Sequence, residues 1–514
     1  MNYKLFFPLF ALTITAQAQD TYINERITNS SSDVIGTARY VGMGGALGAL
    51  GADMSVISWN PAGIGLIRKN DISLTFGGTW GKSHINEEGR GKGTLDQTGF
   101  VYNIKTSNST CPYINFAFNY QKKINFNHNF YADNTNLGGL SQMDQLAGLT
   151  DFVTDNNTSL AGLAYDNNFF LSAGKFMYNN IRASSNEFTH HSEGSLQSFD
   201  FNLSTNINDR AFIGLTVGID NMRYRGWNSY WEFQNNEYNH DVYNDIHISG
   251  TGVNFKLGTI IRPLEDSPFR FGLTIETPTW FDLRNSTVMN LNDYYIDGVE
   301  SYLKFKLRSP WKFRTGIGST IGTVFAWDID YEFADYVGMS MSYPDDSYYS
   351  YDINSNAQKD VAMNRHSRET LRGTHTLRVG LEANASKNLS FRLGYNLSTS
   401  AYEKNVSFDQ LQIAEYGSTA MRDYATNTNY MRLGNTNILT LGMGYRTKNF
   451  YFDLAYKIRN QKGDFYAFDT SFTSNDPVYQ ENVASQYSDI AHSINPVSVD
   501  LTRHAITCTL GFKF

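Results

Sequence analysis

The sequence predicts an all-β protein, a transmembrane antiparallel β-barrel of about 14 strands with a small N-terminal plug inside its lumen. The 514-residue chain is 15% aromatic, yet its mean hydropathy is −0.40 and no stretch after the first residues could form a membrane-spanning helix. Apolar and polar residues alternate in many segments, and short turns alternate with long polar connections. A barrel strand needs only one apolar face to cross a membrane, so such a chain can supply the wall.

Residues 1–18 are expected to be a signal peptide. Lys4, the apolar run 5–12 and the small-residue site Ala16-Gln17-Ala18 are typical of export signals, and the run is too short to span a bilayer. Cys111 and Cys508 are the only cysteines, which excludes a disulfide framework. The formal net charge of −8 argues against nucleic acid as a partner.

Residues 19–70 are expected to form the plug, or hatch, an assignment that rests on a family resemblance of this segment. The segment 36–67 is dense in glycine and alanine, which allow close backbone packing and positive φ angles. Asn60-Pro61 predicts a tight bend. A nucleotide-binding loop is excluded, because Leu47 breaks the required glycine spacing and no Lys-Ser/Thr pair follows.

Residues 71–514 are predicted to form the barrel. In the last strand Ile506, Leu510 and Phe512 alternate with polar residues. Turning the other face outward would bring Arg503 and Lys513 toward lipid, at about 2–4 kcal/mol each near the midplane. The same alternation recurs over 269–276, 325–333, 377–384 and 450–459. A soluble β-sandwich explains any one of these strands equally well.

The lengths of the connections favour the barrel over the sandwich. We predict short turns at 106–110, 207–210, 262–267, 319–323, 386–388 and 447–449, and long loops at 83–97, 123–196, 226–246, 281–300, 334–372, 398–435 and 460–498. This strict alternation is typical of periplasmic turns and extracellular loops in outer-membrane barrels. It predicts about fourteen strands in a bacterial outer membrane, with both termini periplasmic.

The charged residues of the strands are predicted to face the lumen. They are Arg223, Arg225, Glu276, Asp328, Asp330, Glu332, Arg378, Glu382, Arg392, Lys457, Arg459 and Arg503. Buried charges are tolerated when they are paired or hydrated, which favours an internal salt-bridge lattice. A site for an anionic headgroup, formed by some of the arginines, is the alternative.

A helix is predicted in the second long loop, because Ser141 and Asp144 have capping-box spacing. Its apolar residues either pack against 160–163 and 169–171 or form a groove that captures a hydrophobic ligand. The candidate capture residues are Met143, Leu146, Leu149, Phe152, Leu163, Phe169 and Phe170.

No enzymatic activity, metal or cofactor is expected. Catalytic and metal-binding motifs are absent from the sequence. His190, His191 and Glu193 lie in a polar segment without a fourth convergent ligand.

The front segment closely resembles that of the FadL family of outer-membrane transporters for long-chain fatty acids and other hydrophobic compounds, in the form found in Bacteroidetes-type bacteria. The resemblance rests on residues 39–46 (RYVGMGGA), Asp53 and residues 59–63 (WNPAG), with weaker similarity at 271–278, 309–312 and 330–332. It implies a fourteen-stranded barrel plugged by a hatch. The hatch or gate residues that it implies are Arg39, Gly42, Gly44, Gly45, Asp53, Asn60, Pro61 and Ala62.

The resemblance implies passive uptake of fatty acids or similar hydrophobic small molecules. The ligand would bind the apolar loops and leave past the hatch, with lateral exit through the wall as one route. The expected partners are outer-membrane lipid, lipopolysaccharide and the barrel assembly machinery. Two alternatives remain: a shuttle or structural role in secretion, like the PorV proteins of the type 9 system, and an open polar porin.

Overall fold

The structure is a computed structural model that describes residues 33–81, 92–153, 158–173, 176–178, 181–264, 267–292, 299–344, 358–403, 410–469 and 494–514. The expected signal peptide, 1–18, lies outside these residues.

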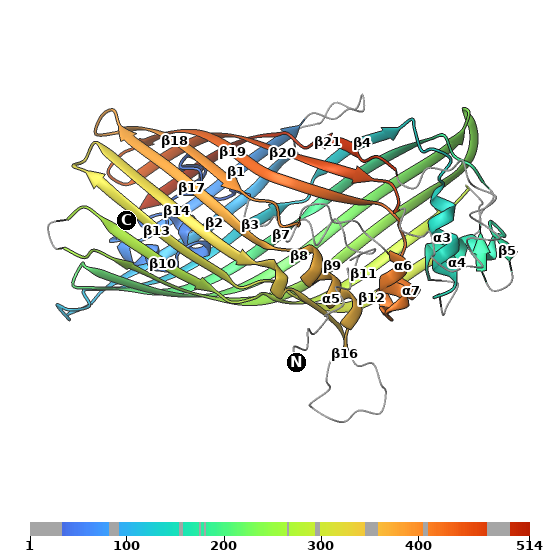
Figure 1. The fold of residues 1–514 in the computed structure, drawn as a ribbon. Coiled ribbons are helices and arrows are strands. Elements are labelled where there is room, and N and C mark those ends of the chain that lie inside the picture. Colours follow the sequence, from blue (N-terminus) through green and yellow to red (C-terminus); the bar gives the residue numbers. More distant parts are fainter. Residues whose placement is uncertain are drawn as a thin grey trace, which may run out of the picture.

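Within the described residues, 14 antiparallel strands close into a barrel, as predicted (Figure 1). The barrel closes because β1 pairs with both β2 and β22. The strands of the wall, some of them interrupted, are β1 (Asp71–Gly81), β2 (Lys92–Lys105), β3 (Tyr113–Asn125) with β4 (His128–Asn134), β7 (Ser185–Ile207), β8 (Ala211–Gln234), β9 (Glu237–Ile261), β10 (Arg270–Glu276) with β11 (Trp280–Leu291), β12 (Val299–Arg308) with β13 (Lys312–Ile321), β14 (Phe325–Asp335) with β15 (Ser340–Tyr343), β17 (Gly373–Asn384), β18 (Leu389–Ser398), β19 (Tyr430–Arg446), β20 (Phe450–Tyr466), and β21 (Val497–Asp500) with β22 (Arg503–Lys513).

All six predicted short turns join neighbouring strands at one end of the barrel. Two predicted loops were largely wrong, however, and a third, 123–196, contains β4 and the first residues of β7. Most of 226–246 belongs to β8 and β9, which meet in a tight turn where Asn235 and Asn236 both have positive φ, as such hairpins require. Much of 281–300 likewise belongs to β11 and β12.

These strands were mistaken for loops because their polarity inverts partway along the barrel. At the turn end of β8, apolar side chains such as Leu215 point outward, while Thr216 and Asp220 point inward and are buried. Beyond Met222 the inward side chains include Tyr224 and Tyr230 of the apolar core, while arginines such as Arg223 and Arg225 point outward. Near the turn end the strands therefore face an apolar environment outside the barrel. Farther along, the same strands enclose an apolar interior.

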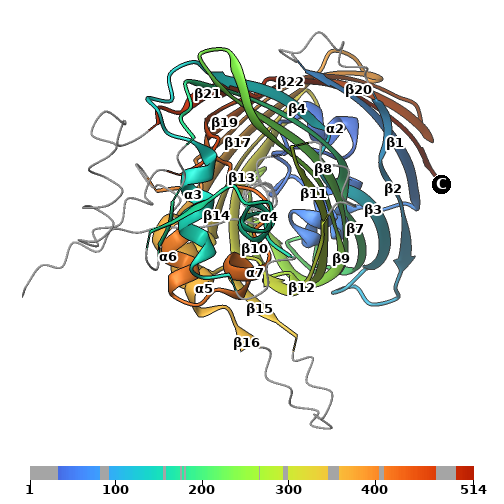
Figure 2. The same ribbon diagram turned by 90° about the vertical axis from the view of Figure 1, so that its right-hand side faces the viewer.

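That apolar interior forms the largest core of the protein. It is built from inward side chains of β4, β7–β9, β11 and β12 and from segments that cover the mouth of the barrel. The covering elements are α3 (Gln142–Thr150), α4 (Leu160–Asp166), β5 (Leu171–Ala173), β6 (Phe176–Tyr178), η4 (Tyr336–Gly338), β16 (Gln358–Lys359), α5 (Val361–Thr370), α6 (Gln410–Glu415) and α7 (Thr419–Asp423). We call them the cap; its helices gather at the end opposite the short turns (Figures 1 and 2). Among the described residues, no helix is long and apolar enough to cross a membrane.

Three adjacent wall strands are interrupted at nearby positions. β10 and β11 are separated by Thr277-Pro278-Thr279, β12 and β13 by Ser309-Pro310-Trp311, and β14 and β15 by η4 and its flanks. Proline cannot donate a ladder hydrogen bond, which explains the first two interruptions. Thr279 and Ser309 hold them together: the Thr279 amide donates to Ser309 Oγ and the Ser309 amide to the Thr279 carbonyl.

The described N-terminal residues, 33–70, lie inside the barrel (Figure 2), toward its turn end (Figure 1). They form α2 (Ala38–Gly42), η2 (Met54–Ser58) and η3 (Pro61–Leu66), joined by glycine-rich turns. Most are buried in a second core, formed largely by the hatch itself. This segment is the hatch of the sections that follow.

Candidate hatch and luminal cavity

Asp53 ties together the two halves of the hatch, which begin with α2 and with η2. Its Oδ1 accepts from the Ser55 amide at the start of η2 and from Thr37 Oγ1, 2.7 Å away, while Thr37 caps α2. One carboxylate thus fixes the N-termini of two short helices, which would not be stable alone.

Arg39 ties α2 to the barrel wall. Its Nε and Nη2 donate to the two oxygens of Glu382 on β17, at 3.0 and 3.2 Å, and its Nη1 donates to the Ala52 carbonyl. A guanidinium and a carboxylate in this two-bond geometry fix orientation as well as distance. Arg39 therefore couples both halves of the hatch to one wall strand.

The three predicted hatch glycines lie in close contacts that leave little room for a side chain, with wall backbone at Gly42 and Gly44 and with Arg378 at Gly45. Gly44 and Gly45 have φ values of +64° and +79°, which favour glycine. Gly42 and Gly44 pack against glycines of the wall: a Cβ added at Gly42 would lie 3.1 Å from the Gly442 Cα, and one at Gly394 would lie 2.1 Å from the Gly44 amide nitrogen. The wall glycines were missed by sequence reasoning; glycine at an inward strand position is the signal that could have found them.

Asn60, Pro61 and Ala62 form a second contact of this kind. Asn60 caps η3 through the Ala62 amide, and its Nδ2 donates to the carbonyls of Gly48, in the hatch, and Thr259, on β9. Pro61 lies against Gly214 and Gly258, paired glycines of β8 and β9 that leave no room for side chains. The predicted bend is therefore also a contact between hatch and wall.

Two carboxyl groups of β14 accept hydrogen bonds from four consecutive backbone amides of the hatch. Asp328 Oδ2 accepts from the amides of Ala49 and Leu50, at 3.1 and 2.8 Å. Asp330 Oδ2 accepts from the amides of Leu47 and Gly48, at 3.1 and 2.8 Å, and from the indole nitrogen of Trp59 at 3.0 Å. These two residues were predicted to face the lumen, but their role as acceptors for the hatch could not be read from the sequence.

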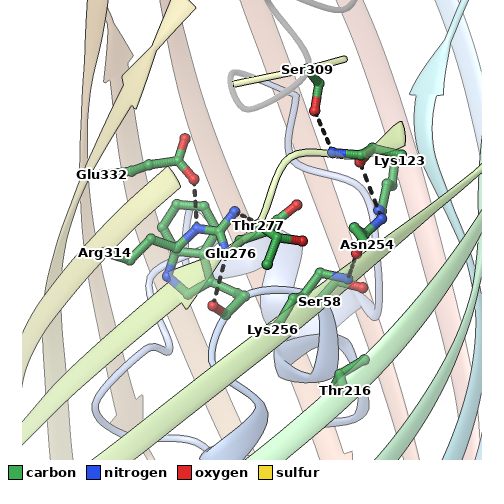
Figure 3. A network of polar contacts seen from close by, with 12 residues as sticks. Ser58, Lys123, Thr216, Asn254, Lys256, Glu276, Thr277, Ser309, Arg314 and Glu332 are labelled. Carbon is green, nitrogen blue, oxygen red and sulfur yellow. Dashed lines mark hydrogen bonds and ion pairs between the residues drawn. The ribbon is translucent and has the colours of Figure 1, made fainter. Parts of the chain in front are cut away.

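Trp59 is held between two wall arginines. The guanidinium carbons of Arg378 and Arg314 lie 3.6 and 4.4 Å from the centre of the indole ring. Arg314 also donates to Glu276 and Glu332 on the neighbouring strands (Figure 3). The indole therefore sits at the junction of the hatch and the charged lumen.

The lumen contains the salt-bridge lattice predicted from the strand charges. Arg314 pairs with Glu276 and Glu332, and Arg392 pairs with Glu382 and Asp453. Asp328, Asp330, Arg378, Lys457, Arg459 and Arg503 also lie on the inner side. Figure 3 shows further members, Lys123 and Lys256; they pair with Asp220 and Asp200.

The predicted luminal position was wrong for Arg223 and Arg225. Both side chains are exposed on the outer face of β8. They share that face with Leu215, but they lie beyond the point where the polarity of the strand inverts. The prediction assumed one polarity for the entire strand.

A cavity of about 80 Å³ lies between the hatch and the interrupted part of the wall. Its lining includes Tyr40, Ser58 and Trp59 of the hatch and Thr279, Ser309 and Pro310 of the interruptions. This volume accommodates a few water molecules but no long acyl chain. Among the described residues, this cavity is therefore too small to serve as an open passage beside the hatch.

The seven candidate capture residues all belong to the apolar core of the cap. Met143, Leu146, Leu149 and Phe170 are buried in it, and Phe152, Leu163 and Phe169 pack against it at its edge. The predicted capping box of α3 is present. The apolar face of α3 thus packs within the cap, which was the first of the two predictions. A role in ligand capture stays a prediction.

Among the described residues, no three histidine, cysteine, aspartate or glutamate side chains are grouped to hold a metal ion. His190 and His191 belong to β7, where each contacts an asparagine, Asn228 and Asn129.

An apolar outer belt, a charged lumen and an internal hatch define the class: a plugged outer-membrane-type β-barrel. Two solved structures share the fold. A Pseudomonas aeruginosa FadL homologue has a TM-score of 0.53 at 12% identity, covering 93% of this chain and 98% of that one. The CymD monoaromatic hydrocarbon channel has a TM-score of 0.50 at 9% identity, covering 94% and 98%.

At such low identity the similarity concerns the fold, and it matches the FadL-type architecture that the front segment predicted. No family model and no curated protein sequence matches the chain. The comparisons do not bear on the bacterial group.

Proposed function

We propose that this protein takes up hydrophobic small molecules passively across the bacterial outer membrane, with long-chain fatty acids as the first class to test. The observation that carries the proposal is the inversion of polarity along the wall. It places a large apolar interior under the cap, directly above a charged lumen closed by a hatch. The cap end would face outward, with both termini in the periplasm.

The composition of the cap core suits ligands of varied shape. Buried methionines are numerous in it: Met143, Met222, Met289, Met339, Met341, Met363, Met421 and Met431. Methionine is unbranched and polarizable, so such a core can repack around an inserted molecule. The capture residues of α3 and α4 lie at the mouth, where a ligand would enter first.

The charged lumen is a poor path for an acyl chain, because burying charges against hydrocarbon is costly. The interrupted wall offers a shorter route. Thr279, Ser309 and Pro310 line the cavity beside the hatch, and outside them lie the exposed side chains of Trp280 and Trp311. We propose that the ligand leaves sideways here once the hatch residues that contact Asp328, Asp330 and Glu382 shift.

A reversible crosslink tests uptake and route together. In a background with Cys111 and Cys508 changed to serine, Thr279→Cys/Ser309→Cys should form a disulfide across the interruption. We expect uptake of radiolabelled oleate by a complemented deletion strain to fall at least tenfold under oxidation and to recover on reduction. Thr376→Cys/Ser398→Cys is the matched control, because it joins another Thr–Ser pair on neighbouring strands, β17 and β18.

Equal oleate uptake by the deletion strain and the complemented strain would refute fatty-acid uptake. Uptake unaffected by the Thr279–Ser309 crosslink would refute only the lateral route. Stable association with a secretion machine in a pull-down, with no lipid retained in the barrel, would instead favour the shuttle role.

A further inference from the structure

A group of basic side chains on the outer wall takes no part in the luminal lattice. We define the basic strip as Arg223 on β8, Arg284 on β11, and Lys304, Lys306 and Arg308 on β12. All five side chains are exposed, and they alternate along their strands with buried apolar residues of the cap core. They therefore point away from the hatch, the cavity and the ligand path.

Strand register brings four of these residues side by side. Arg223 of β8 and Arg284 of β11 both stand opposite Ser249 of the intervening strand β9. Arg284 in turn stands opposite Lys304 of β12, and Lys306 follows two positions along that strand. The positive charges thus lie in a row on β8, β11 and β12, with the uncharged Ser249 of β9 between the first two, and these strands neighbour one another in the wall (Figure 1).

The row lies at the edge of the apolar belt. On β8 the outward apolar side chains begin at Ile213, ten residues before Arg223. Ten residues of a strand tilted by about 45° rise about 24 Å, close to the roughly 25 Å height of the apolar band of such barrels. On β12, Arg308 stands opposite Trp280, whose exposed ring marks the border of the belt.

Most of these charges lack a carboxylate partner within the protein. In the described part of the chain, Arg223, Arg284, Lys304 and Lys306 form no ion pair. The nearby Arg225 differs, because it pairs with Asp245 at 2.8 Å and lies over Trp227. Asp282 stands opposite Lys306, yet no ion pair forms between them. A row of uncompensated cations on a chain of net charge −8 indicates an anionic partner outside the protein.

We propose that the basic strip binds the phosphate groups of a phosphorylated glycolipid, the lipid A part of lipopolysaccharide, in the outer leaflet. Headgroup phosphates lie at the height of the row, and three or more cations within two strand positions match a molecule that carries two phosphates. Trp280 and Tyr302, exposed at the border of the strip, suit its sugars and upper acyl chains. The choice of leaflet rests on the orientation given in the proposed function.

The test uses the full-length protein in a zwitterionic detergent and purified bis-phosphorylated lipid A as the probe. We expect Arg284→Gln/Lys304→Gln/Lys306→Gln to weaken binding about 100-fold, on the order of what three interfacial cations supply. The control, Lys387→Gln/Lys448→Gln/Lys462→Gln, removes the same number of exposed lysine or arginine charges elsewhere on the barrel and should change binding less than threefold.

Two arms identify the ligand. Dephosphorylated lipid A should bind at least tenfold more weakly than the bis-phosphorylated form, and inorganic phosphate at equal concentration should not compete. Equal binding of the dephosphorylated lipid, full competition by inorganic phosphate, or equal losses in the strip and control variants would each overturn the proposal.

A salt titration of the unmodified protein needs no variant. Binding of bis-phosphorylated lipid A should weaken about tenfold between low and high salt, because exposed charges are screened. Binding independent of salt would overturn the proposal. Oleate uptake is measured separately, so failure here would leave the transport proposal standing.

Discussion

At the scale of single residues, Asp328 and Asp330 concentrate the attachment of the hatch on one strand. Together their Oδ2 atoms accept four hatch amides and the Trp59 indole N–H. Hydrogen bonds to carboxylates are stronger than neutral ones, and the lumen shields them from water. Such bonds can hold a hatch firmly in place and still break without a covalent change.

Replacing Asp330 by alanine should loosen the hatch. Asp330→Ala leaves the amides of Leu47 and Gly48 and the Trp59 indole without their acceptor, which should cost about 2 kcal/mol of hatch docking. We expect faster amide exchange over 47–50 and larger single-channel conductance in planar bilayers. Asp282→Ala, on the outer face, is the control; unchanged exchange in Asp330→Ala would show that the hatch is held elsewhere.

Gly394 is a wall residue at which a side chain would collide with the backbone of the hatch. Gly394→Val places a Cβ where the Gly44 amide lies, so the hatch must move or the barrel must distort. We expect the same gain in conductance together with a lower midpoint of thermal unfolding. In Gly78→Val the added Cβ meets no atom within 4 Å, so this strand variant should match the unmodified protein.

At the scale of elements, α3 is anchored to the wall by a buried polar network. Glu232 of β8 accepts from Ser141 Oγ at 2.7 Å, the Gln142 amide at 2.9 Å and Tyr230 Oη at 2.6 Å. His240 of β9 contacts both Gln142 and Glu232, at 3.2 and 3.5 Å. A carboxylate at the N-terminus of a helix also complements the helix dipole.

This network makes the cap sensitive to acid. Burial lowers the pKa of His240 below its ordinary 6.5, although the Glu232 and Asp241 carboxylates act to raise it. Below pH 6.5, His240 therefore binds a proton more readily in the unfolded cap than in the folded cap. The folded cap consequently loses stability as the pH falls. Exchange protection of the Met143 and Leu146 amides should decrease from pH 7.5 to 5.5, after correction for intrinsic rates.

His240→Gln keeps a polar side chain that cannot titrate. In this variant the exchange protection of the Met143 and Leu146 amides should be nearly constant from pH 7.5 to 5.5. If the variant and the unmodified protein lose protection equally, another group governs the effect.

At the scale of the whole molecule, the wall consists of two zones with opposite polarity. One zone exposes apolar side chains and encloses charges; the other exposes a mixture of charged, polar and aromatic side chains and encloses a mainly apolar core. The first zone suits a lipid exterior and the second suits water. The barrel is therefore taller than a membrane requires, and the extra height houses the cap core.

Matched substitutions on β8 test the two zones. Leu215 and Trp231 are outward and similarly exposed, at 46% and 43%. Leu215→Arg should destabilise the protein by about 2–4 kcal/mol, because it places a charge inside the apolar belt. Trp231→Arg should change the free energy of unfolding by no more than about 0.5 kcal/mol, because Trp231 lies beyond the apolar belt. Equilibrium unfolding in urea from lipid vesicles measures both; equal costs would contradict the division.

The fold was predictable from sequence where the same face of a strand is apolar along its entire length. In β14, β17 and β22, outward apolar residues alternate with inward polar ones, and the six tight turns follow from composition and spacing. The ends of β8, β9, β11 and β12 were missed because alternation reports two faces but not which face meets lipid. Arg223 and Arg225 were misplaced for the same reason.

Local chemistry therefore determined from sequence alone the number of strands, the positions of the short turns, the bend at Asn60-Pro61 and the capping box of α3. Only the tertiary structure decided which inward side chains meet. The pairing of Arg39 with Glu382, of Gly44 with Gly394 and of hatch amides with Asp330 joins residues hundreds of positions apart. Such contacts depend on how the closed barrel brings its strands around the hatch, and no single segment encodes that arrangement.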